Sequence, residues 1–238
     1  MKKTSIKYNA IAGVMSLLAA SSSVLAQDLN ITVTNLTQGL YFTPIVTAAH
    51  DDSNNLFSVA ESATPELQAM AEGGDISGLV SLLSNANANI VENPAAGLLA
   101  PSTSTTFMLT NDAENNYLSL AAMILPSNDG FVGLNSWMIP ETAGTYTLYL
   151  NAYDAGTEAN NELIVTGSGA PNVLGIPAAP GGNAGSNGTG VTTTEDNNLI
   201  HIHRGSLGDD DLNAGKSDLN NSVHRWLNPI AKFTVVVN

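Results

Sequence analysis

The segment Gly144-Thr145-Tyr146-Thr147-Leu148-Tyr149-Leu150 alternates strictly between polar and apolar side chains. Successive side chains of a β-strand point to opposite faces, so this pattern predicts a strand over Thr145–Tyr153 with one face in solvent. Further strands are predicted from alternating or short apolar runs at Leu29–Thr34, Tyr41–Ala49 (interrupted at Pro44), Thr105–Thr110, Tyr117–Leu125, Phe131–Leu134, Glu162–Gly167, Leu199–His203 and Ile230–Val237. The predicted fold is all-β: an antiparallel β-sandwich of about eight strands.

The β pattern is interrupted between Ser62 and Ser84, where two short helices are predicted. Thr64 followed by Pro65 is typical of an N-cap and a first helical position, and Gly73-Gly74 is typical of a helix end. Asp75 can cap the second helix, in which the apolar residues share one face: Ile76, Leu79, Val80 and Leu83. We expect both helices to form a side layer over the sandwich.

Residues 168–198 are rich in Gly, Pro and Asn and contain few large apolar side chains. This composition predicts a long mobile loop. The chain shows no repeat of fixed period.

Residues 1–26 have the pattern of a secretory signal peptide, with Lys2, Lys3 and Lys7, then the apolar run Ile11–Leu18, then Val24-Leu25-Ala26. The mature protein is expected to be one domain, 27–238, secreted or periplasmic. Three of the seven basic residues lie in the leader, so four remain against 21 acidic residues, a net charge of −17. This charge argues against nucleic acid and anionic membranes as partners, and no later segment is long and apolar enough for membrane insertion. The absence of cysteine excludes disulfides, thiolate zinc sites and a Cys nucleophile.

Three carboxylates follow strand-like runs at glycine-containing turns. Asp129 follows the apolar run Leu118–Leu125, and Asp154 and Glu158 follow the alternating run Thr145–Tyr153. Oxygen ligands delivered by two loops at strand ends suit calcium, a hard cation that takes six to eight oxygens. Asp, Asn and Gly are also ordinary turn residues, so spacing alone leaves both interpretations open.

The two segments resemble the signature of the spondin N-terminal domain family, which opens F-spondin and mindin and also occurs alone in secreted bacterial proteins. The family carries a Pro-Ser-x-Asp-x-x-Val-Gly segment, here Pro126–Gly133, and an Asp-Ala-Gly-Thr-Asp segment, here Asp154–Glu158. The opening Thr32–Thr37, with Pro44 and Ala49-His50-Asp51, and the ending Trp226–Val235 are also similar to bacterial members.

This resemblance implies a sandwich similar to a C2 domain with calcium at one end, held by Asp129, Asp154 and Glu158. Two positions depart from the animal proteins. Glu158 stands where they have Asp, and its longer arm could ligate differently; Gly130 stands where they have Trp, which removes an aromatic wall beside the loop. The cysteines of the animal domain are missing.

Two other clusters could bind metals. His201 and His203 share one face of a predicted strand, and His50 and His224 could add nitrogens for zinc or copper, although a structural role at the sandwich edge is the simpler interpretation. Asp209-Asp210-Asp211 with Asp218 could hold a second cation, but the run lacks the spacing of an EF-hand loop, and acidic runs are normally solvated.

The functional prediction is a secreted calcium-binding adhesion or matrix-type module without catalysis, whose unknown extracellular or cell-surface ligand is a protein or a polysaccharide. One alternative is a hydrolase that uses the paired carboxylates Asp154 and Glu158. Sugar-cleaving clefts usually display several aromatics, whereas Trp137 and Trp226 are the only tryptophans and are expected to be core anchors. The other alternative is a periplasmic transition-metal-binding protein that uses His201 and His203.

Overall fold

The computed structural model describes residues 27–112, 114–181, 185–211 and 213–238, so the predicted signal peptide 1–26 lies outside the described residues. The described strands are β1 (Asp28–Asn35), β2 (Tyr41–Phe42), β3 (Val46–His50), β4 (Asn89–Glu92), β5 (Ser104–Thr110), β6 (Tyr117–Leu125), β7 (Gly130–Met138), β8 (Gly144–Asp154), β9 (His201–Ile202) and β10 (Ala231–Val237). The helices are α1 (Pro65–Gly73) and α2 (Ser77–Asn85).

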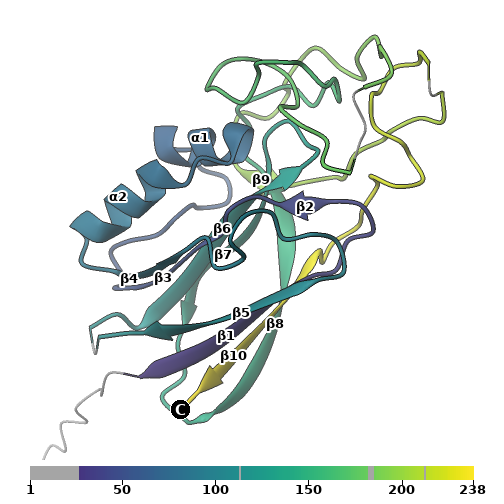
Figure 1. Cartoon of the computed structure of the whole chain (residues 1–238). Helices are drawn as coiled ribbons and strands as arrows, with labels where there is room; N and C mark the ends of the chain where they lie inside the picture. Colours follow the sequence, from purple (N-terminus) through teal and green to yellow (C-terminus); the bar gives the residue numbers. More distant parts are fainter. Residues whose placement is uncertain (1–26, 113, 182–184, 212) are drawn as a thin grey trace, which may run out of the picture.

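All strand pairs between these elements are antiparallel, and β8 belongs to two sheets. Its first part pairs with β10, in the order β8-β10-β1-β5, with Leu150 opposite Ala231. Its last part pairs with β7, in the order β4-β3-β6-β7-β8, with Asp154 opposite Gly130. The two sheets pack face to face (Figure 1), which confirms the predicted all-β antiparallel sandwich.

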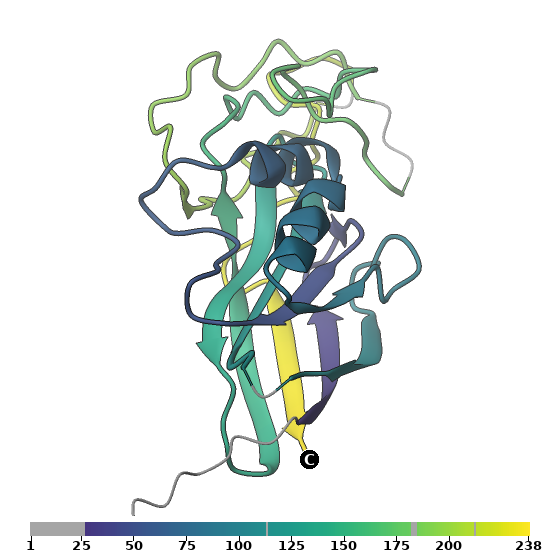
Figure 2. The ribbon, with the colours of Figure 1, turned by 90° about the vertical axis from the view of Figure 1, so that its left-hand side faces the viewer.

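The sequence of strand β6 is apolar without alternation because both faces of the strand are buried. Leu118, Leu120 and Ile124 contribute to the core between the sheets. Ala121 and Met123 contribute to a second cluster under the helices, together with Leu67, Met70 and Leu79. Figure 2 shows α1 and α2 covering this outer face, so the molecule has three layers. Trp226 lies in the core between the sheets and Trp137 packs against it, as predicted.

The first helix begins as the sequence predicts. The Thr64 hydroxyl accepts a hydrogen bond from the Leu67 N–H, and Gly74 at φ +74° ends the helix in the left-handed conformation. The second helix has Ile76 at the N-cap position instead of Asp75, which accepts a hydrogen bond from the Ser77 N–H through its carboxylate.

Two strand predictions need correction, and one strand was not predicted. Glu162–Gly167 is not a strand but makes one isolated bridge, from Ile164 to Ile176, because its backbone groups are taken up by loop contacts. Leu199–His203 is reduced to the two residues of β9. Asn89–Glu92 forms β4, which the sequence analysis missed, because a strand of four half-buried or exposed residues carries little pattern.

The long loops between β8 and β10 gather at one end of the sandwich (Figure 1, green to yellow). Buried carboxylates organise them: Asp218 accepts hydrogen bonds from the backbone N–H groups of Ile164, Ser186 and Gly188. Glu162 accepts from those of Leu207 and Gly208. The described part of 168–198 contains no helix or strand, as predicted; its mobility remains a prediction.

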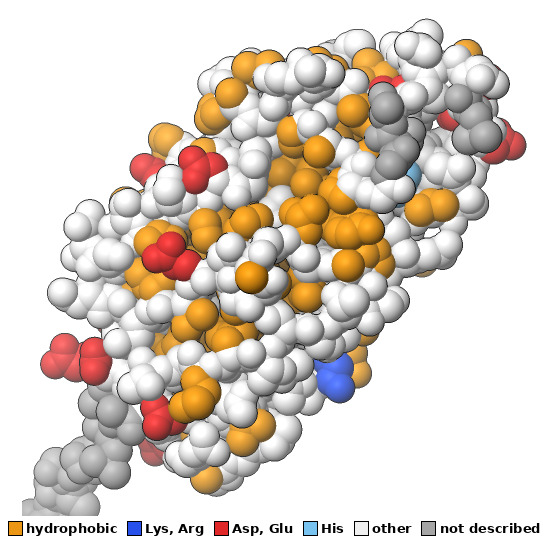
Figure 3. Space-filling view, in the orientation of Figure 1, with side chains coloured by type: hydrophobic (Ala, Val, Ile, Leu, Met, Phe, Trp, Pro, Cys, Tyr) orange, Lys and Arg blue, Asp and Glu red, His pale blue; other side chains and the backbone are white. Residues whose placement is uncertain are grey.

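Acidic side chains are scattered over the face shown in Figure 3, and basic ones are nearly absent from it. None of the described helices is long and apolar enough to cross a membrane.

Candidate metal centre

The two motif loops lie side by side because β7 and β8 are hydrogen-bonded neighbours. Asp129 directly precedes β7, Asp154 ends β8, and Gly130 is paired with Asp154. The Ala155 N–H donates to the Asp129 carbonyl at 3.2 Å, which extends the pairing beyond the strand ends. The sheet itself therefore brings together the two carboxylates that the sequence placed 25 residues apart.

Asp129 is fully buried, and no described Lys, Arg or His forms an ion pair with it. Its Oδ2 accepts hydrogen bonds from the Thr157 N–H at 2.8 Å and the Glu158 N–H at 3.1 Å. Its Oδ1 is buried without any hydrogen-bond partner in the described residues. Burial and the neighbouring Asp154 carboxylate raise the pKa of Asp129 well above its ordinary value. An ionised carboxylate in this position requires a compensating positive charge.

Asp154 is held by its own turn and by an amide. Its Oδ1 accepts from the Gly156 N–H at 2.9 Å, and its Oδ2 accepts from the Asn160 Nδ2 at 2.7 Å. The turn requires glycine at 156, where φ is +68° and a Cβ would come within 2.7 Å of the Asn198 backbone. The Oδ2 also lies 3.7 Å from the His201 Nε2 and 3.8 Å from the His203 Nε2.

Glu158 continues the same loop and is 4% exposed. Its Oε2 accepts hydrogen bonds from the Asn128 Nδ2 and the Gly175 N–H, both at 3.2 Å. Its Oε1 is buried without a partner in the described residues. Burial raises the pKa of Glu158 to about 7.

The three predicted ligands thus share one end of the sandwich but do not form a ready-made cage. Among the described residues, no three His, Cys, Asp or Glu side chains are arranged closely enough to hold one ion. Asp154 is turned toward the two histidines, and Glu158 toward Asn128. Two orphaned carboxylate oxygens, on Asp129 and Glu158, are the feature that fits a cation.

The family model Spondin_N matches residues 34–166, more than half of the chain, and spans both motif loops. The chain belongs to the spondin N-terminal family. A search of curated proteins found no match to the chain. The matched region ends before β9 and β10, so the ending Trp226–Val235 lies outside it. Membership indicates an extracellular module.

The four histidines lie at three separate locations in the fold. His50 contacts the Asp51 carbonyl and the Ser119 hydroxyl, each at 2.7 Å, and His224 contacts the Asn220 N–H. Only His201 and His203 lie together, and the Nε2 atoms of both are near the Asp154 carboxylate, a contact that the sequence analysis did not predict. Among the described residues, neither His50 nor His224 joins them in a group that could hold a metal ion.

The tautomer of His203 weighs against metal ligation. The Gly205 N–H donates to its Nδ1 at 3.0 Å, so in the neutral ring the proton is on Nε2. The lone pair that a metal needs is then absent from the nitrogen that faces Asp154. In His201, by contrast, Nδ1 contacts the Leu199 carbonyl at 2.8 Å, which leaves the Nε2 lone pair free in the neutral ring.

The acidic run 209–211 uses its carboxylates as acceptors for its own loop. Asp209 accepts from the backbone N–H groups of Asp211, Lys216 and Ser217, and Asp211 accepts from those of Asn213 and Ala214. These contacts favour the loop-organising role over the second cation site.

The sequence analysis missed the amides of the candidate metal centre. Asn128 bridges the two motif loops: its Nδ2 donates to Glu158 and to the Asn161 Oδ1, and its Oδ1 accepts from the Glu162 N–H. Its position next to Asp129 in the Pro-Ser-Asn-Asp turn was the available signal, but turn residues are common enough that the signal is weak.

Proposed function

We propose that this protein is a secreted, non-catalytic module that binds calcium at the end of the sandwich where Asp129, Asp154 and Glu158 meet, and that adheres to an extracellular or cell-surface ligand. The proposal rests first on the buried Asp129 carboxylate, which has one oxygen without a hydrogen-bond partner and no ion pair with Lys or Arg among the described residues.

Electrostatics support a cation at this place. The only ion pairs among the described residues are the two between Asp154 and the histidines, so no basic side chain offsets the charge of Asp129 or Glu158. Buried charges are normally paired or bind metals, because an isolated one is costly. Without a cation, both carboxyl groups are driven toward the protonated form.

The donor set favours calcium among the common ions. Carboxylate oxygens and the nearby amide and backbone carbonyls are hard ligands, and calcium tolerates irregular shells of six to eight oxygens. Magnesium demands a stricter octahedron at shorter distances and gives up water reluctantly. Because the three carboxylates do not converge, calcium binding requires Asp154 or Glu158 to leave its present contacts.

A binding role is supported over catalysis by the burial of the paired carboxylates. Asp154 and Glu158 are 1% and 4% exposed, and the cavity beside them, lined by Asn128, Asn160 and His203, measures about 10 Å³. A hydrolase needs both carboxyl groups to reach a substrate and a water. Secretion is supported by the leader-like residues 1–26 and by the extracellular character of the family.

Thermal melting tests the calcium site. Extracellular calcium modules bind with dissociation constants of about 10⁻⁴–10⁻³ M. Calcium at about 100 times that constant should stabilise the fold by roughly 2.7 kcal/mol relative to chelator, and magnesium should do much less. Asp129→Asn and Asp154→Asn should abolish the shift, whereas Asp210→Asn, in the exposed acidic run, should keep it. A wild-type melting temperature that does not respond to calcium removes the site.

A further inference from the structure

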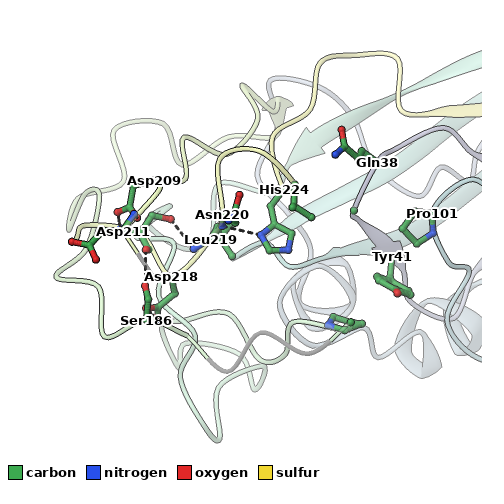
Figure 4. A pocket seen from close by; sticks show the side chains of 15 residues that line it. Gln38, Tyr41, Pro101, Ser186, Asp209, Asp211, Asp218, Leu219, Asn220 and His224 are labelled. Atoms are coloured by element: carbon green, nitrogen blue, oxygen red, sulfur yellow. Dashed lines mark hydrogen bonds between the residues drawn. The ribbon is translucent and has the colours of Figure 1, made fainter. Parts of the chain in front are cut away.

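A second site lies on the same end of the molecule, away from the metal centre. A pocket of about 450 Å³ opens between β2 and the loop 209–224, and none of Asp129, Asp154 and Glu158 lines it. Figure 4 shows His224 between two unlike walls, with Tyr41 and Pro101 on one side and the acidic loop with Asp211 on the other. Its volume falls within the range of small-molecule sites.

His224 directs an unused hydrogen-bond donor into this pocket. The side chain is 6% exposed, and the Asn220 N–H donates to its Nδ1 at 3.0 Å, which leaves the proton of the neutral ring on Nε2. Burial lowers the pKa of His224, so the ring stays neutral at physiological pH. No described residue accepts a hydrogen bond from this Nε2. A ligand oxygen that enters the pocket can accept a hydrogen bond from this Nε2–H in place of water.

The other polar groups of the pocket complement this donor. The Tyr41 hydroxyl has no hydrogen-bond partner among the described residues and can both donate and accept. The Oδ1 of Asp211 accepts hydrogen bonds from two backbone N–H groups. Its Oδ2 has no hydrogen-bond partner in the described part of the chain and can accept a hydrogen bond from a ligand hydroxyl. The Tyr41 ring, Pro101 and Val223 supply the apolar surface of the pocket.

Charge restricts the ligand class. No Lys or Arg is among the described residues that line the pocket, and Asp209, Asp211 and Asp218 make it negative, so phosphate, sulfate and carboxylate ligands are disfavoured. A ligand must offer hydroxyl donors to Asp211, a hydroxyl acceptor to His224 and an apolar C–H face to Tyr41. We propose that this pocket binds a neutral sugar residue, either free or at the end of a polysaccharide chain.

The test is a titration of the purified protein with glucose, galactose, mannose and N-acetylglucosamine, followed by saturation-transfer NMR. At least one sugar should bind saturably. Tyr41→Phe removes one neutral hydrogen bond and should weaken binding about threefold or more; Asp211→Asn removes a charged acceptor and should weaken it about tenfold or more. His224 is buried and its replacement could disturb the turn 220–224, so the two other variants carry the test.

Matched controls make the same chemical changes outside the pocket. Tyr149→Phe alters a tyrosine that is 62% exposed on β8, and Asp210→Asn alters the exposed neighbour of Asp211. Both should leave sugar affinity unchanged. The disaccharide and trisaccharide of the sugar that binds are titrated in the same way. Tighter binding of these oligosaccharides than of the monosaccharide would identify the end of a polysaccharide chain as the ligand, and equal binding would identify the free sugar.

The proposal is overturned if no sugar binds saturably, if the control variants weaken binding as much as the pocket variants, or if only a divalent cation binds and Asp211→Asn abolishes it. It stands apart from the calcium proposal, because sugar binding should persist in chelator and in Asp129→Asn.

Discussion

The Nε2 atom of His203 lies 3.8 Å from the Oδ2 atom of Asp154 and makes no hydrogen bond with any described residue, although the imidazole is buried. Its other nitrogen is occupied by the Gly205 N–H. The ring therefore packs as a neutral group against Trp226, at a centroid distance of 4.8 Å. Asp154 consequently lies between a histidine whose neutral ring carries its proton on Nε2 and the loop that carries Glu158.

His203 is predicted to remain neutral, with its proton on Nε2, throughout the physiological range. Burial lowers its pKa to about 4. Long-range ¹⁵N NMR of the imidazole rings between pH 4.5 and 8 measures this directly. Zinc and copper titrations should likewise show no stoichiometric binding that His203→Gln abolishes. A bare Nε2 signal at neutral pH would contradict the assignment and reopen the transition-metal alternative.

Glu158→Gln is predicted to stabilise the protein in chelator in a pH-dependent way. The folded-state pKa of about 7 lies above the ordinary 4.5, so the fold favours the protonated carboxyl. Its contribution to stability is fully present below about pH 4.5 and is lost as pH rises through 7. The difference in melting temperature between variant and wild type should thus be near zero at pH 4.5 and largest at pH 8.

Burial lowers the pKa of three histidines, so their contribution to stability is lost at low pH rather than at high pH: His50, His203 and His224. Because variant and wild type are compared at the same pH, this contribution is the same in both and cancels. Saturating calcium should abolish or reverse the advantage of the variant at pH 8. An advantage that is the same at pH 4.5 and pH 8 contradicts the raised pKa.

Asp218→Ala is predicted to loosen the long loops. The carboxylate accepts three backbone N–H groups from 164, 186 and 188, and hydrogen bonds to a charged group each contribute about 1.5–3 kcal/mol. A loss of at least about 2 kcal/mol in urea denaturation is expected, with faster amide exchange at those three positions. Asp196→Ala, in an exposed position, serves as the control. Equal losses in both variants would mean that Asp218 has no special role.

Gly133→Ala is predicted to destabilise the sandwich by about 1–3 kcal/mol, the usual cost of overpacking a core. An added Cβ would lie 2.7 Å from two ring atoms of Phe57, which is itself packed against Phe131 and Tyr153. Gly144→Ala is the matched control on β8, because its Cβ would meet nothing closer than 3.6 Å. That variant should be neutral or slightly stabilised. Chemical denaturation of both variants measures their free energies of unfolding, and equal values for the two would contradict the prediction.

Much of the fold could be predicted from local pattern. Alternation gave β1 and β8, and the helix cap at Thr64 gave the start of α1, because these signals depend only on neighbouring residues. The run Glu162–Gly167 does not form a strand because its backbone groups make hydrogen bonds with the surrounding loops instead of with a neighbouring strand. Local pattern contains no information on such distant partners.

The sequence by itself determined which carboxylates follow the strands and, through the family signature, that Asp129, Asp154 and Glu158 belong to one end of the fold. Only the tertiary structure decided their contacts: it turned Asp154 toward two histidines and left one oxygen each of Asp129 and Glu158 buried without a hydrogen-bond partner among the residues that the structure describes. It also placed Tyr41 and His224, 183 residues apart, in one pocket. Strand pairing and loop packing fix these contacts, and both depend on non-local burial rather than on the order of neighbouring residues.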